Sequence, residues 1–142
     1  MRSRFNILRF ATAALLGSAL HGCGKPASVQ PVAVRGQVLL QGRPLVNGSI
    51  VFAPNREKGN IGKTVAAPLD LEGRYHFPAD GPKSLTPGWY RIALAEPPDL
   101  NLTASGYPPF PIALRRPDLA GLDRELVAGG ENTLDFLIEV GE

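Results

Sequence analysis

Few residues of this chain could carry out chemistry, and they do not form a familiar catalytic set. Cys23 is the only thiol, and His21 and His76 are the only histidines, among 142 residues. After Cys23 a Ser-His-Asp triad could use only His76, and no serine stands in the Gly-x-Ser-x-Gly context of a nucleophile elbow. We therefore expect a protein that is not an enzyme, with His76 as an exposed strand residue.

Acidic residues offer the next candidates, as metal ligands. Asp70, Glu72, Asp118 and Asp123 are the carboxylates considered, but their spacing does not match a calcium-binding EF-hand loop. Asp70 and Glu72 are better interpreted as turn residues. A zinc site would have to be built from carboxylates alone, which is not how proteins usually hold zinc. We expect neither a metal site nor a cofactor.

The charge distribution argues against nucleic-acid binding. The formal net charge is +2, but Arg2, Arg4 and Arg9 precede Cys23 and no acidic residue does. The rest of the chain has 12 basic and 13 acidic residues. A nearly neutral domain without a basic stripe is a poor partner for phosphates.

The first 22 residues have the pattern of an export signal. The three arginines are followed by an uncharged run from Phe10 to Leu20. A helix needs about 20 apolar residues to span a bilayer, and this run is shorter. Residues 1–22 are therefore predicted to be a helical signal peptide.

The end of this segment, Leu20-His21-Gly22-Cys23, resembles the lipobox of bacterial lipoproteins. The resemblance implies that Cys23 is lipidated and becomes the mature N-terminus, with the membrane as a partner. By the same resemblance, Gly24 stands where lipoproteins retained at the inner membrane have Asp, which favours the periplasmic face of the outer membrane, with the cell surface as the alternative. The competing interpretation is an N-terminal helix with a buried cysteine.

The remaining chain divides into a tether and one β-domain. Residues 23–31 are short, polar and Pro-containing, as expected of a lipidated tether. Residues 32–140 contain strand-type alternation and no convincing helical period. The expected strands are 32–40, 49–53, 64–69, 74–77, 89–95, 122–127 and 134–140. A Pro-rich irregular segment covers 96–122, and a hairpin-like turn is expected at 128–132. The pattern predicts an all-β fold, a seven-stranded antiparallel β-sandwich.

Residues 32–140 contain a series of short motifs: Val34-x-Gly36-x-Val38, Gly42-x-Pro44-Leu45, Ile50-Val51-Phe52-Ala53-Pro54, Asp70-Leu71-Glu72-Gly73-Arg74-Tyr75-His76-Phe77 and Pro87-Gly88-x-Tyr90-x-Ile92. Their order and turn chemistry resemble carboxypeptidase regulatory-like domains. The resemblance implies a transthyretin-like (prealbumin-like) sandwich. Aromatic residues fall on the inward parity of the predicted strands and are expected in the core: Phe52, Tyr75, Phe77, Tyr90 and Phe136.

Three other aromatic residues could form an exposed surface. Trp89 lies on the parity opposite to Tyr90, and Tyr107 and Phe110 flank a stiff run of prolines. One interpretation is a carbohydrate- or peptide-binding surface made with the 96–122 loop. The other is a hydrophobic lid over the sandwich edge.

These features together predict a lipid-anchored protein of the cell envelope. Its β-domain is expected to be a non-catalytic interaction or structural module, with an envelope protein or a glycan as partner. Carbohydrate or peptide binding is the alternative.

Overall fold

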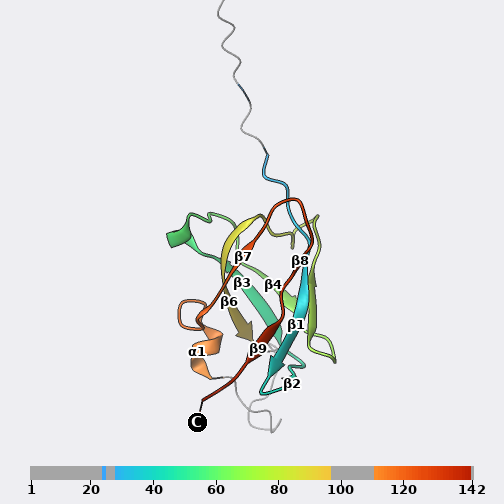
Figure 1. Cartoon of the computed structure of the whole chain (residues 1–142), viewed down its shortest axis with the longest axis vertical. Coiled ribbons are helices and arrows are strands. Elements are labelled where there is room, and N and C mark those ends of the chain that lie inside the picture. The colour runs from blue at the N-terminus through green and yellow to red at the C-terminus, as the bar shows by residue number, and fades with distance from the viewer. Residues whose placement is uncertain (1–23, 25–27, 97–110, 142) are drawn as a thin grey trace, which may run out of the picture.

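The computed structural model describes residues 24, 28–96 and 111–141. They form two β-sheets packed face to face, with an extended segment leaving one end (Figure 1). The predicted signal helix, Cys23, Tyr107 and Phe110 lie outside the described residues.

The described chain contains strands and only two short helical segments. In order, these elements are β1 (Val34–Leu40), β2 (Arg43–Pro44), β3 (Ser49–Pro54), the 3-10 segment η1 (Arg56–Lys58), β4 (Val65–Pro68), β5 (Arg74–Phe77), β6 (Gly88–Ala95), α1 (Ile112–Arg115), β7 (Leu122–Leu126), β8 (Asn132–Thr133) and β9 (Phe136–Ile138). Each of the seven expected segments overlaps one of these strands, and the short strands β2 and β8 lie outside them. The four-residue α1 lies in the segment expected to be irregular. No helix in the described ranges is long and apolar enough to cross a membrane.

The strands form an all-β sandwich of a five-stranded and a four-stranded sheet. In the first sheet, β1 is central: β2 and β5 pair with it antiparallel, and β8 and β9 pair with it in parallel. The second sheet has the order β4-β3-β6-β7, with every pairing antiparallel.

The expectation of a wholly antiparallel sandwich is therefore wrong for the C-terminal strands. The turn at 128–132 is not a hairpin either, because β7 belongs to the second sheet and β8 to the first. The chain crosses between the sheets there, and it re-enters beside Val34 at the start of β1. Because β1 also starts at this end, β8 and β9 run in the same direction as β1.

The core aromatic residues are buried as expected. Phe52 from the second sheet contacts three rings, with centroid distances of 4.9 Å to Phe77, 6.0 Å to Tyr75 and 5.9 Å to Tyr90. Phe136 is also buried, whereas His76 between Tyr75 and Phe77 is exposed. Strand alternation thus correctly assigned the two faces of β5.

Two buried tyrosines each donate a hydrogen bond from the side-chain hydroxyl to a backbone carbonyl. Tyr90 Oη donates to Thr86 O at 3.0 Å, four residues upstream, in the manner of a tyrosine corner. Tyr75 Oη donates to Leu134 O at 2.6 Å. That carbonyl can approach β1 only because residue 36 is glycine: a Cβ on Gly36 would lie 1.8 Å from Leu134 O.

The sandwich has two ends: we call the one where the N-terminal segment joins the domain the tether end, and the opposite one the far end. The tether end consists of residues 28–33, 55–64, 78–87 and 127–131. The far end consists of residues 41–48, 69–73, 111–121 and 139–141. At the tether end an isolated bridge between Val32 and Leu85 fixes the point where the extended segment joins the domain (Figure 1).

Candidate functional site

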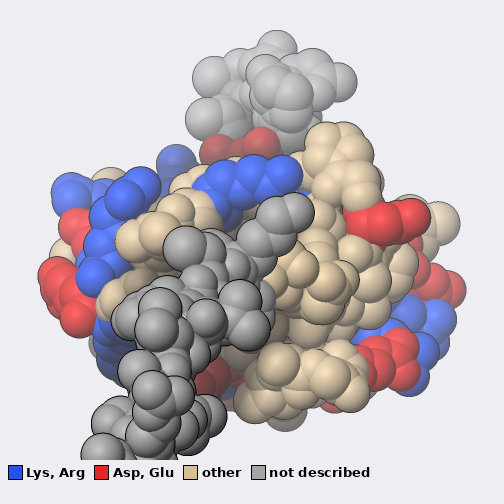
Figure 2. Space-filling model, turned by 90° about the horizontal axis from the view of Figure 1, so that it is seen from above, with Lys and Arg blue, Asp and Glu red and all other residues tan. Residues whose placement is uncertain are grey.

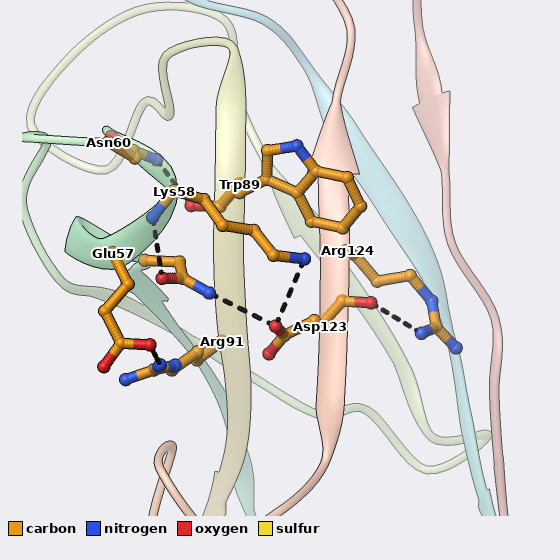
Figure 3. Close-up of polar contacts among 8 residues, drawn as sticks. Glu57, Lys58, Asn60, Trp89, Arg91, Asp123 and Arg124 are labelled. Carbon is orange, nitrogen blue, oxygen red and sulfur yellow. Dashed lines mark hydrogen bonds and ion pairs between the residues drawn. The ribbon is translucent and has the colours of Figure 1, made fainter.

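Trp89, the described member of the expected aromatic surface, lies half-buried on the outer face of β6. Lys58 of η1 extends across it, with its Nζ 3.5 Å from the ring centroid (Figure 3). A cation at this distance is attracted to the negative face of the indole. One face of Trp89 is therefore already occupied by a side chain of the same molecule.

Two buried asparagines hold Lys58 in this position. Asn55 caps η1, where its Oδ1 accepts from the backbone N–H of Lys58 at 3.2 Å, and Gly59 ends the turn at φ 83°. Asn60 donates from Nδ2 to the carbonyl of Trp89 at 2.8 Å. These amides attach the β3–β4 connection to β6, so the position of Lys58 over the ring is built into the backbone.

Asp123 of β7 completes the cluster shown in Figure 3. Its Oδ2 lies 3.6 Å from Lys58 Nζ and accepts from Asn55 Nδ2 at 3.2 Å. Next to it, Arg91 pairs with Glu57. Lys58 and Arg91 each have an acidic partner, and Arg124 donates to the backbone carbonyl of Asp123. The cluster is therefore suited to holding β6, β7 and η1 together rather than to acid–base chemistry.

A shallow groove of about 570 Å³ on the outer face of the first sheet contains His76. Its other lining residues are Arg35, Gly36, Gln37, Pro68, Asp70, Arg74, Tyr75, Thr133 and Asp135. In the strand register Arg35 lies opposite both His76 of β5 and Thr133 of β8. The arginine thus separates the imidazole from the threonine hydroxyl, and a hydroxyl–imidazole nucleophile is not assembled.

The carboxylates around this groove are engaged in the fold. Asp135 Oδ1 accepts from the backbone N–H of Gln37 at 2.9 Å. Asp70 Oδ1 accepts from the N–H groups of Glu72 and Arg74, which confirms the turn role expected for Asp70.

Away from the groove, the hydrogen bond from Arg116 lowers the pKa of Asp118. Within the described residues no three His, Cys, Asp or Glu side chains gather as a metal site.

Burial raises the pKa of the Tyr75 phenol above its usual value, and the nearby Asp135 carboxylate raises it further. The phenol therefore stays protonated and donates to Leu134 O. Tyr75 is a structural hydrogen-bond donor between β5 and the segment before β9.

The structure places only one of the four expected site residues. Trp89 is at the surface, while Cys23, Tyr107 and Phe110 lie outside the described residues. Sequence reasoning missed Lys58, Asn55 and Asn60. Their signal was an Asn directly after a strand and a Gly four residues later, which is typical of a capped short turn.

Comparisons with known proteins identify no relative of this chain. A scan against protein-family models finds no match, and searches of the curated proteins and of the solved structures find none either.

Proposed function

We propose that this protein is a lipid-anchored component of the cell envelope whose β-sandwich is a non-catalytic interaction or structural module. The observation that carries the proposal is the way the chain enters the domain. Ser28, Val29 and Gln30 are exposed, and packing begins only at Val32. Residues 28–30 thus fit the spacer proposed between Cys23 and a domain with its own core.

The anchor itself would be a lipid on Cys23. Each buried lipid CH₂ contributes about 0.8 kcal/mol, so two or three acyl chains hold a protein firmly on a membrane. Gly24 favours the periplasmic face of the outer membrane as the final location, with the cell surface as the alternative.

Local structure supports the finer assignment to a transthyretin-like, carboxypeptidase regulatory-like domain. Gly36 makes the close approach to Leu134, and Gly73, at φ 72°, lies in the turn before β5. Tyr90 of the Pro87-Gly88-x-Tyr90 motif makes the tyrosine corner. The residues that carry the family resemblance are thus those with specific backbone roles.

The non-catalytic part of the proposal follows from the partners of the candidate groups. His76 is separated from Thr133 by Arg35, and Asp123 is engaged by Lys58 and Asn55. Enzymes usually keep such groups free to exchange protons with a substrate.

The test is the chemical state of Cys23 in the protein isolated from cell envelopes. Trypsin does not cut efficiently before Pro26, so the expected N-terminal peptide runs from Cys23 to Arg35 and carries acyl chains by mass spectrometry. Cys23→Ser should abolish incorporation of labelled fatty acid, whereas the tether control Ser28→Ala should retain it. An unmodified cysteine in the envelope-bound protein would overturn the anchor.

Carbohydrate or peptide binding at Trp89 remains the second candidate, supported by the half-exposed indole on the outer face of β6. If this surface stacks on a ligand, Trp89→Ala should abolish binding on a glycan or peptide array. Lys58→Ala, which uncovers the ring face, should preserve or increase it. Equal binding by the parent protein and Trp89→Ala would exclude this surface.

A further inference from the structure

The tether end of the sandwich exposes apolar side chains that the core does not use. Ile61 is 85% exposed and Val29 is 64% exposed. Both line a shallow groove at this end with Lys58, Thr86 and Pro87. Two exposed apolar side chains on one groove, beside the point where the chain leaves the domain, form a surface that a partner can cover.

Unpaired charges at this end are mainly basic. Arg56, Lys63 and Lys83 are exposed and form no ion pair among the described residues. The acidic Glu57 and Glu131 are each paired with an arginine on a strand, and Asp80 is the one acidic residue of these loops without such a pair in the described ranges. Figure 2 looks down onto this end and shows uncharged side chains in its middle, with basic and acidic ones around them.

The far end has a different charge. It also exposes apolar side chains such as Leu71, but residues 41–48, 69–73, 111–121 and 139–141 include three basic and four acidic residues. Anionic headgroups would repel this end. An exposed apolar residue among unpaired basic side chains therefore occurs at the end that bears the tether.

The tether is too short to keep the domain away from its anchor. Residues 24–31 span at most about 25–30 Å when fully extended. Apolar side chains flanked by Lys and Arg bind the boundary between lipid headgroups and acyl chains, and anionic lipids strengthen that binding.

We propose that the tether end docks on the bilayer that holds the lipid, with Ile61 in the headgroup boundary and Arg56, Lys63 and Lys83 against anionic headgroups. The inference rests on the lipid anchor proposed above. It gives the protein a fixed orientation, in which the far end faces away from the membrane and is the surface available to another protein.

The experiment uses the acylated protein in vesicles of phosphatidylethanolamine and phosphatidylglycerol. With Cys23 acylated, an introduced cysteine is the only free thiol and can carry an environment-sensitive fluorophore. Ile61→Cys reports on the tether end. Leu71→Cys, at a residue 79% exposed, is the matched control at the far end. A quencher attached to lipid should lower the fluorescence at position 61 at least about threefold more than at position 71.

Charge variants separate docking from mere proximity. Arg56→Glu, Lys63→Glu and Lys83→Glu combined should reduce quenching at position 61, as should replacing phosphatidylglycerol with phosphatidylcholine. Arg43→Glu at the far end should leave it unchanged. Equal quenching at positions 61 and 71 in protein that floats with the vesicles overturns the docking and leaves the anchor intact. Protein that does not float with the vesicles overturns both.

Discussion

The strands within the first sheet and those within the second sheet are held together in different ways. In the second sheet, neighbouring strands share four to six residue pairs, and all run antiparallel. In the first sheet, β1 shares only two to four pairs with each neighbour. Side-chain bonds to the backbone add to these short ladders, including Tyr75 to Leu134 O and Asp135 to the N–H of Gln37. Because β8 and β9 pair with β1 over only two and three residues, each such contact is a larger share of what holds them than it is in the second sheet.

The largest expected effect comes from Phe52, the residue that joins the sheets. Phe52→Ala removes ring contacts to Tyr75 and Phe77 across the core and should lower the free energy of unfolding by about 3–5 kcal/mol. Denaturant unfolding followed by circular dichroism and by fluorescence should still give one transition. Two separate transitions would show that the sheets unfold independently.

A methyl group on Gly36 tests the first sheet alone. Gly36→Ala places a Cβ against Leu134 O and should cost about 1–3 kcal/mol of unfolding free energy, because β9 must move away from β1. Gly130→Ala is the matched control: nothing lies within 4 Å of its added Cβ, so the change should stay within about 0.5 kcal/mol. Equal effects of the two substitutions would contradict the close approach.

Removing one tyrosine hydroxyl in each sheet compares the two sheets directly. Tyr75→Phe leaves Leu134 O without its donor, and Tyr90→Phe does the same to Thr86 O. Each should cost about 1 kcal/mol. Hydrogen exchange should differ: Tyr75→Phe should speed exchange in β9, whose ladder is short, more than Tyr90→Phe speeds it in β6.

Alkaline pH acts on the first sheet through the same phenol. The pKa of Tyr75 is raised above its ordinary value of 10.0, so above that pH the unfolded chain loses a proton that the folded protein retains. The unfolding free energy should therefore be constant near neutral pH and fall as the pH rises above about 10. Tyr75→Phe should show a shallower fall, and an unchanged slope would contradict the raised pKa.

The smallest expected effect is at Lys58, on the outer face of the second sheet. Its ion pair with Asp123 is partly exposed, so Lys58→Ala should cost less than about 1 kcal/mol. The emission of Trp89, the only tryptophan, should nevertheless change because the ring loses its cation. Lys83→Ala is the control and should leave the emission as it is.

The sequence predicted the second sheet better than the first. Alternation located its strands and placed Phe52 and Tyr90 in the core, because side-chain period is a local property. The direction of β9 escaped prediction, because alternation identifies the buried face of a strand and not its neighbour. The contact of Lys58 with Trp89 joins residues that are distant along the chain, and no local pattern records it.

The parallel pairing of β1 with β9 has a mechanical consequence. β1 starts at the tether end, and β9 leads to residues 139–141 at the opposite end (Figure 1). A pull applied between the tether and these residues would load the hydrogen bonds between the two strands in shear, all at once. Antiparallel neighbours pulled at one end open bond by bond, like a zipper. The domain can thus carry tension along its length with only a few short strands.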